Sequence, residues 1–250
     1  MQKTDYSKIA VTYNLRYQEN YLPKIYKNLK EIIQSNNYKN ILEAGCGTGR
    51  WIKDLKKDGL NVYGLDYSFE MLKIPRRDVP GIKVVNADAD FIPYKDKAFD
   101  LIFCMNAIHH FPDKEKFIKE CARLLVDDGT IAIYGVDPYL DKDWYVYKYF
   151  DGVLDNDLIR FPSREHLKYL LIQNGFYEIN VSVAEEVWGR RVGEEVLSDP
   201  FLQKHSCSQL ANLSDEDYQK GINKIKDQIE NDSQTVFVTS VIFYLVSAKK

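Results

Sequence analysis

The sequence predicts an α/β protein in which helices cover a mainly parallel β-sheet, and two observations carry this prediction. Over the first two thirds of the chain, short apolar runs typical of buried strands alternate with segments whose apolar residues recur at helical spacing. Such alternation builds βαβ units, whose strands pair in parallel. The chain has 250 residues, which is enough for one large domain with a complete core and does not require a second domain.

The predicted elements follow one another in a regular order. Residues 22–33 carry an apolar stripe that predicts a helix ending in the turn-rich stretch SNNYKN. Between the fourth and fifth predicted strands, a helix is expected to open with Pro112 in its first turn and to stop at Asp128-Gly129. The runs that predict buried strands are residues 40–44, 61–66, 82–88, 99–104 and 130–135.

The pattern changes after the fifth predicted strand. Residues 139–161 are rich in aromatic side chains and show no strand pattern, which suggests an insertion or a lid. Ser163 is predicted to cap a helix that is followed by a strand near 179–183, and Ser214 is predicted to open a further helix. The last apolar run, residues 235–250, predicts a long strand that enters the middle of the sheet.

Composition and charge narrow the function classes. The 34 basic and 37 acidic side chains are spread along the chain, so no large basic surface for nucleic acid is expected. A cytoplasmic protein without a membrane span is expected, because there is no long apolar span and no pattern typical of a signal peptide. The four cysteines lie far apart, so neither a disulfide framework nor a metal site is predicted.

The stretch NILEAGCGTGRWI, residues 40–52, points to a ligand. A strand that runs into a glycine-rich turn and then a helix lies at the carboxyl edge of an open α/β sheet, where ligands bind. Gly45, Gly47 and Gly49 follow the pattern G-x-G-x-G, and Arg50 stands where a dinucleotide fingerprint has its third glycine. The spacing therefore argues against a nicotinamide-dependent oxidoreductase.

The motif E-x-G-x-G-x-G after a strand resembles the first motif of class I S-adenosylmethionine-dependent methyltransferases. GLDYSFEML resembles their second motif, and NADADFIPYKDKAFDLIFCMNAIHHF and LLVDDGTIAIY resemble the stretches that follow, the last with departures at residues 126–128. By pattern the chain is similar to small-molecule enzymes that include the quinone-biosynthesis methyltransferases. The resemblance implies a Rossmann-like fold whose seven-stranded sheet has the order 3-2-1-4-5-7-6, with the last strand antiparallel. It also implies S-adenosylmethionine as cofactor and S-adenosylhomocysteine as product.

The resemblance further implies where the cofactor binds. The glycines would face its methionine and ribose, Asp66 would accept the ribose hydroxyls, Asp88 would meet the adenine, and Asn106 would line the pocket. Tyr6 and Tyr13 lie in a pattern that folds over the cofactor in related enzymes, although they also fit an amphipathic helix that packs its aromatic residues. The full set of expected cofactor residues is Tyr6, Tyr13, Glu43, Gly45, Cys46, Gly47, Gly49, Asp66, Tyr67, Asp88, Ala89 and Asn106.

Candidates for catalysis come from the ends of the fourth and fifth strands. His109 and His110 lie near where the methyl group should emerge, and either is a candidate general base or a pocket-lining residue. Asp137 is a candidate base or substrate contact, or a plain turn aspartate. Arg160 and Arg164 fit either a pair that binds a substrate carboxylate or phosphate, or solvated surface residues.

One methyltransferase domain, residues 1–250, is therefore expected, with an N-terminal helical cover (1–36) and lid insertions (137–165 and 186–232). The aromatic residues of the lid either form a substrate pocket or close a helical subdomain, and a pocket would suit a partly apolar or aromatic small molecule. The expected function is methyl transfer to an N, O or C nucleophile of a small metabolite or natural-product intermediate, in a monomer or homodimer. Two alternatives stay open: a non-catalytic S-adenosylmethionine-binding protein that stabilises a partner complex, and an RNA or protein methyltransferase.

Overall fold

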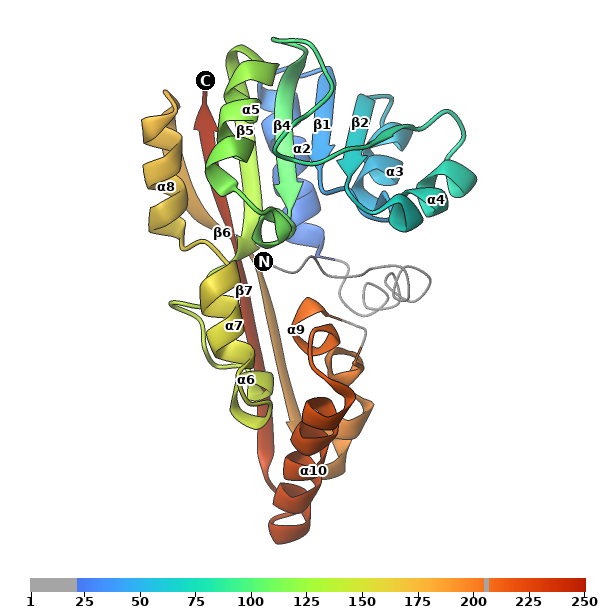
Figure 1. The fold of residues 1–250 in the computed structure, drawn as a ribbon, viewed down its shortest axis with the longest axis vertical. Helices are drawn as coiled ribbons and strands as arrows, with labels where there is room; N and C mark the ends of the chain where they lie inside the picture. Colours follow the sequence, from blue (N-terminus) through green and yellow to red (C-terminus); the bar gives the residue numbers. More distant parts are fainter. Residues whose placement is uncertain (1–21, 205–206) are drawn as a thin grey trace.

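A computed structural model describes residues 22–204 and 207–250. Within them a seven-stranded sheet has the order β3-β2-β1-β4-β5-β7-β6 (Figure 1). β1 to β5 pair in parallel, and β7 runs antiparallel to β5 and β6, which confirms the sheet order that the motifs imply. The strands are β1 Asn40–Ala44, β2 Asn61–Asp66, β3 Lys83–Asn86, β4 Phe99–Met105, β5 Leu125–Val136, β6 Tyr177–Val192 and β7 Val236–Lys249.

One face of the sheet is covered by α2 (Pro23–Ser35), α3 (Arg50–Lys57) and α4 (Phe69–Asp78). The apolar stripe predicted for the first helix is buried here, with Ile25 and Leu29 fully inaccessible. Their burial on the sheet explains why a helix forms at this point, since packing of an apolar face supplies most of a helix's stability.

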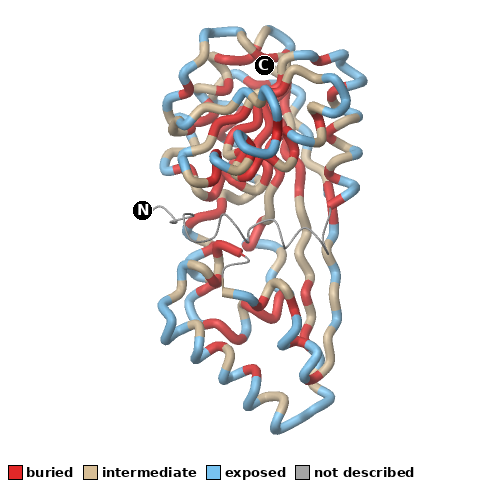
Figure 2. The backbone as a smooth tube through the Cα atoms, turned by 90° about the vertical axis from the view of Figure 1, so that its right-hand side faces the viewer, coloured by how far each residue is buried: buried red, intermediate tan, exposed pale blue. Residues whose placement is uncertain are grey.

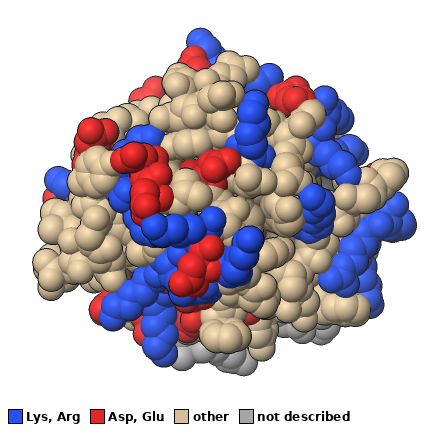
Figure 3. Space-filling model, turned by 90° about the horizontal axis from the view of Figure 1, so that it is seen from above, with Lys and Arg blue, Asp and Glu red and all other residues tan. Residues whose placement is uncertain are grey.

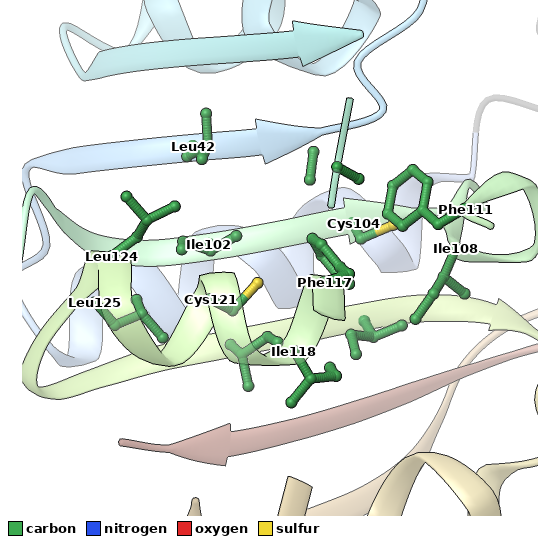
Figure 4. Packing of buried hydrophobic residues seen from close by; sticks show 14 of the residues in the cluster. Leu42, Ile102, Cys104, Ile108, Phe111, Phe117, Ile118, Cys121, Leu124 and Leu125 are labelled. Carbon is green, nitrogen blue, oxygen red and sulfur yellow. The ribbon is translucent and has the colours of Figure 1, made fainter. Parts of the chain in front are cut away.

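The other face is covered by α5 (Lys114–Leu124) and α8 (Arg164–Gln173). Figure 4 shows α5 above the sheet, with Phe117 and Cys121 near Ile102 of β4. Because β4 is buried on both sides, its sequence is a nearly continuous apolar run rather than an alternating one.

A second lobe lies beyond the carboxyl ends of the parallel strands. β7 pairs with β5 only from Phe243 onward, whereas it pairs with β6 along its whole length, so the two strands continue as a ribbon past the sheet (Figure 1). Helices α6 (Tyr145–Tyr149), α7 (Val153–Arg160), α9 (Ser208–Ala211) and α10 (Asp215–Asn231), with short 3-10 turns, pack on this ribbon. We call this part, residues 144–160, 187–204 and 207–242, the helical lobe; Figure 2 shows its own buried segments below those of the sheet.

Most predicted elements are confirmed, and the exceptions have local causes. The helix expected to open at Pro112 begins at Lys114, because the Asp113 side chain accepts the N–H of Lys116 at 3.0 Å and caps it. That helix ends at Leu124, and Asp128-Gly129 instead lies in an irregular part of β5, where Asp128 has a φ of +62°.

One predicted strand is longer than expected. The strand expected near 179–183 runs to Val192, because β7 continues to pair with it as far as Val236. Residues 186–192, at the start of the expected lid range 186–232, belong to this strand. The helices predicted after Ser163 and Ser214 are confirmed, and both serine hydroxyls accept a backbone N–H three residues on. In the described parts of the chain, none of the helices has the length and apolar character needed to cross a bilayer.

Candidate functional site

Two cavities open where the parallel strands end. The first, which we call the turn cavity, lies between the glycine turn after β1 and the ends of β2 and β4. The expected cofactor residues that line it are Gly45, Gly47, Asp66, Tyr67, Asp88, Ala89 and Asn106. The fold thus brings together residues from four separate motifs.

The shape of the glycine turn depends on positive φ angles, which are +75° at Gly45, +51° at Gly47 and +70° at Gly49. A Cβ on Gly45 would lie 2.5 Å from the Cβ of Ala107, and one on Gly49 would lie 2.6 Å from the Cβ of Pro75. A Cβ on Gly47 would meet no atom within 4 Å. The first and third glycines are therefore needed for packing as well as for backbone conformation.

The N–H groups of this turn are used within the fold. Those of Gly45 and Cys46 both donate to the carbonyl of Leu65 at 2.9 Å, and that of Gly47 donates to Asp66 at 2.7 Å. A phosphate cradle needs such groups directed at its anion. This arrangement suits a ligand without a phosphate at the turn, in agreement with the glycine spacing.

Replacing Gly45 with alanine is expected to destabilise the fold by about 2–5 kcal/mol. A left-handed backbone costs about 1–2 kcal/mol for a residue with a Cβ, and the contact with Ala107 adds an overpacking cost of about 1–3 kcal/mol. Gly47→Ala is the matched control, because it keeps the backbone cost and has no contact. Urea unfolding of both variants measures the difference, and equal losses would contradict the packing argument.

Asp66 ends β2 at the wall of the turn cavity. Its Oδ2 accepts the N–H of Gly47 at 2.7 Å, and its Oδ1 accepts the N–H of Ser68 at 2.8 Å. Burial raises the pKa of the Asp66 carboxyl, and these two hydrogen bonds oppose the shift. Each carboxylate oxygen has a second lone pair, so the group can still accept two hydroxyl donors from a ligand.

Three further expected residues of the lining, Tyr67, Asp88 and Ala89, lie along the loops after β2 and β3. Tyr67 is 61% exposed at the rim, and Ala89 is buried. The Oδ1 of Asp88 accepts the N–H of Asp90 at 3.3 Å. These residues form the side of the turn cavity opposite the glycine turn.

Three expected cofactor residues do not line the turn cavity. Glu43, at the end of β1, and Cys46 and Gly49, within the glycine turn, are absent from its lining, and Glu43 is 1% exposed. Burial and the nearby Asp66 raise the pKa of Glu43, and the guanidinium of Arg50 opposes the shift. Any effect of Glu43 on a ligand therefore passes through its neighbours. Tyr6 and Tyr13 lie outside the described residues.

The second cavity, which we call the lobe cavity, lies between the ends of β4 and β5 and the helical lobe. It is partly open to solvent. Met105, Asn106 and His110 line both cavities. The two cavities therefore meet at the end of β4.

Asn106 occupies this junction in a strained conformation. Its φ is +46°, and its backbone N–H donates to the carbonyl of Tyr134 at 2.8 Å. Its side-chain Oδ1 is buried and accepts no hydrogen bond from the described residues. Strained residues of this kind concentrate at functional sites.

The two histidines have different surroundings. His109 is 3% exposed and stacks on Phe161, with ring centroids 3.9 Å apart and planes inclined by 13°. His109 lines the lobe cavity, whereas His110 lines both cavities. His110 therefore lies at their junction.

Asp137 is held by the protein itself. It is 2% exposed, accepts the N–H groups of Tyr139 and Arg164 at 3.1 and 3.0 Å, and pairs with the Arg164 guanidinium at 3.4 Å. It lines neither the turn cavity nor the lobe cavity. This geometry favours a structural role for Asp137.

Arg160 is not a solvated arginine, and it does not face the lobe cavity. It is 8% exposed, pairs with Asp157 at 3.1 Å and donates to the Ser208 hydroxyl at 3.0 Å. Asp157 also accepts from Tyr147 at 2.9 Å and from Gln209 at 3.0 Å. We call this set of five residues the Asp157 network; three of its members, Tyr147, Ser208 and Gln209, form part of the cavity wall.

The sequence analysis missed much of the lobe cavity. Asp141 sits among solvated charges in the stretch LDKDW, and residues 240–243 of β7 form a sheet strand and a cavity wall at once. No pattern in the neighbouring residues marks Asp141 or residues 240–243 as part of a cavity. Of the aromatic cluster, Trp144 and Tyr147 line the cavity, while Trp144, Tyr145 and Phe150 belong to the lobe's core, so the cluster contributes to a cavity wall and to the packing of the lobe.

Comparisons with known proteins agree with this architecture. Residues 42–133 match the family model of a methyltransferase domain. An uncharacterised protein of Methanocaldococcus jannaschii is 33% identical over 152 residues, 60% of this chain and 57% of its own length. Demethylmenaquinone methyltransferase of Lactobacillus johnsonii is 26% identical over 68% of this chain and 79% of its own length. The bovine protein named probable tRNA methyltransferase 9B is 31% identical over 44% of this chain and 24% of its own length.

Solved structures share the fold. A methyltransferase assigned to an antibiotic biosynthesis pathway of Anabaena variabilis has a TM-score of 0.65 at 22% identity, covering 88% of this chain and 96% of that chain. A methyltransferase of Thermotoga maritima that depends on S-adenosylmethionine has a TM-score of 0.62 at 20% identity, covering 98% of both chains.

Sheet order, glycine turn and the acid that ends β2 together form a Rossmann-like fold that solved methyltransferase structures share. The match of residues 42–133 to a methyltransferase domain and the named relatives support a class I S-adenosylmethionine-dependent methyltransferase, an enzyme whose cofactor is S-adenosylmethionine.

Proposed function

We propose that the protein transfers the methyl group of S-adenosylmethionine, bound in the turn cavity, to an N, O or C nucleophile of a small acceptor in the lobe cavity. The observation that carries the proposal is the junction of the two cavities at Met105, Asn106 and His110. A cavity next to the methyl group is what transfer requires and what a protein that only binds the cofactor does not need.

In this proposal, different residues of the turn cavity contact different parts of the cofactor. Gly45 and Gly47 contact its methionine and ribose, Asp66 accepts hydrogen bonds from the ribose hydroxyls, and Asp88 with Ala89 contacts the adenine. The support for Asp66 is its orientation, since backbone N–H groups hold both of its oxygens in place.

The cofactor supplies an electrophilic methyl group on a sulfonium. The protein aligns the nucleophile, keeps water away and accepts a proton where the nucleophile carries one. We propose the helical lobe as the substrate cover, and His110 as the group positioned to accept the proton. The aromatic walls of the lobe cavity suit an acceptor that is partly apolar.

Replacing His110 with alanine is expected to slow methyl transfer by roughly 10²–10⁴-fold, the usual contribution of a general base, while affinity for S-adenosylmethionine stays nearly unchanged. His109→Ala is the matched control. It removes a ring packed on Phe161 and is expected to reduce stability by about 1–3 kcal/mol with a smaller effect on rate. Single-turnover rates of both variants test this, and equal rate losses would count against His110.

The main alternative is that the methyl acceptor is an RNA or a protein. The name of the bovine relative, probable tRNA methyltransferase 9B, is the reason to consider RNA. A nucleic-acid track would need a continuous basic surface. On the end of the molecule opposite the helical lobe, acidic and basic side chains are intermixed across the middle of the face (Figure 3). The lobe cavity, with its aromatic walls, fits a small acceptor better than a polymer.

Calorimetric titration with S-adenosylmethionine and S-adenosylhomocysteine, with nicotinamide dinucleotides as controls, is the direct test. Micromolar binding of the first pair alone is expected, followed by transfer of a labelled methyl group into a pool of small metabolites. Binding without transfer into any pool would favour the non-catalytic alternative, and labelling of RNA or protein would replace the small-molecule proposal.

A further inference from the structure

Among the described residues, the lobe cavity has one acidic side chain in its lining, and it makes no ion pair. This residue is Asp141, the formally charged residue of the described lining apart from the two histidines. Behind the wall, Arg160 pairs with Asp157 at 3.1 Å, and Arg164 pairs with Asp137 at 3.4 Å while also attracting Asp141, which interacts with the Tyr244 hydroxyl. Because Arg164 is shared between two carboxylates, the described charges leave Asp141 able to bind a further cation.

Aromatic rings surround the same space. Trp144, Tyr147, Phe201 and Phe243 line it, and Trp144 meets Tyr147 and Phe201 edge to face, with centroids 5.3 and 6.1 Å apart. Aromatic faces attract cations, by about 0.5–2 kcal/mol each depending on how dry the site is. A carboxylate within aromatic walls is a combination that favours a positively charged ligand.

Three buried polar atoms of the lining have no hydrogen-bond partner among the described residues: Asp141 Oδ2, Asn106 Oδ1 and Trp144 Nε1. Trp144 is itself only 6% exposed. Buried polar groups are normally satisfied, and leaving one unsatisfied costs about 1–3 kcal/mol. A ligand that satisfies these two acceptors and one donor has N–H donors for the acceptors and a neutral oxygen for the donor.

We propose that the methyl acceptor is a small amine that is positively charged near neutral pH, with its ammonium group bound by Asp141 against the ring faces. Before the amine nitrogen attacks the methyl group, one ammonium proton passes to the base proposed above, His110, which frees the lone pair that forms the new N–C bond as the C–S bond of the cofactor breaks. The Trp144 N–H then donates to a neutral oxygen of the same molecule. This inference rests on the proposed function and narrows its substrate class. The same geometry disfavours an anionic acceptor, because it would bring a second negative charge beside Asp141, and the described cations behind the wall, Arg160 and Arg164, are already paired.

Three probes that differ at one end test the charge preference: tyramine (an ammonium), 4-ethylphenol (neutral) and 4-hydroxyphenylacetate (a carboxylate). They are titrated by calorimetry into protein saturated with S-adenosylhomocysteine at pH 8. Tyramine is expected to bind at least about tenfold more tightly than 4-ethylphenol, a difference of about 1.4 kcal/mol, and the carboxylate is expected to bind least.

Two variants assign the preference to one residue. Asp141→Asn keeps the shape of the side chain and is expected to abolish the preference for tyramine. Asp143→Asn makes the same charge change two residues away on an exposed side chain outside the cavity lining, and it is expected to keep the preference. Unchanged affinity for S-adenosylhomocysteine in both variants verifies that they are folded.

The inference is overturned if 4-ethylphenol or 4-hydroxyphenylacetate binds as tightly as tyramine, if none of the probes binds, or if the preference survives Asp141→Asn. These outcomes leave the proposed function intact as long as S-adenosylhomocysteine binds. Failure of the unaltered protein to bind S-adenosylhomocysteine would instead remove the proposed function, and this inference with it.

Discussion

Replacing Asp157 with alanine is expected to destabilise the protein by about 3–5 kcal/mol, the cost of leaving a buried charge without its partner. Arg160 would stay in a site where it is 8% exposed and would lose its ion pair with Asp157. Tyr147 and Gln209 would lose their acceptor at the same time. Urea unfolding, followed by tryptophan fluorescence, measures the loss.

Asp155→Ala is the control for this prediction, because Asp155 lies on the same helix and is exposed. Its expected effect is at most about 1 kcal/mol, from the helix dipole alone. A second comparison separates the ion pair from packing. The double variant Asp157→Leu, Arg160→Met removes both charges and is expected to lose less stability than Asp157→Ala. If Asp157→Ala loses no more than Asp155→Ala, the Asp157 network does not hold the cavity wall.

Replacing Asp66 with alanine is expected to weaken S-adenosylmethionine binding by about 1.5–3 kcal/mol, or roughly 10- to 150-fold. The change removes the proposed hydrogen bonds to the ribose. It also frees the N–H groups of Gly47 and Ser68, which now hold the turn against the end of β2.

Asp66→Asn is the matched control, because it keeps the shape and one acceptor oxygen and loses the charge. Calorimetry should place its affinity between those of the unaltered protein and Asp66→Ala. An affinity that is unchanged in Asp66→Ala would remove Asp66 from the proposed ribose contact, even if the fold is intact.

Much of the fold could be predicted because its signals are local. The buried strands β1, β2 and β4 are short apolar runs, and the serines that cap α8 and α10 are recognisable from the residues next to them. The predicted helix start at Pro112 was wrong by two residues, because Asp113 was the better cap. The long ribbon was missed, because whether β6 ends near 183 or at Val192 depends on its pairing with β7, far along the chain.

For the candidate site, too, some features could be predicted from local sequence and others depended on the tertiary structure. The sequence by itself determined the sheet, the glycine turn and the acid that ends β2, since each is encoded within one strand and the turn that follows it. Only the tertiary structure decided that His110 faces both cavities while His109 stacks on Phe161. It alone decided that Arg160 is buried against a serine 48 positions away. These outcomes depend on packing between distant segments and on the exclusion of solvent by this packing. The residues next to each side chain in the sequence determine neither of these.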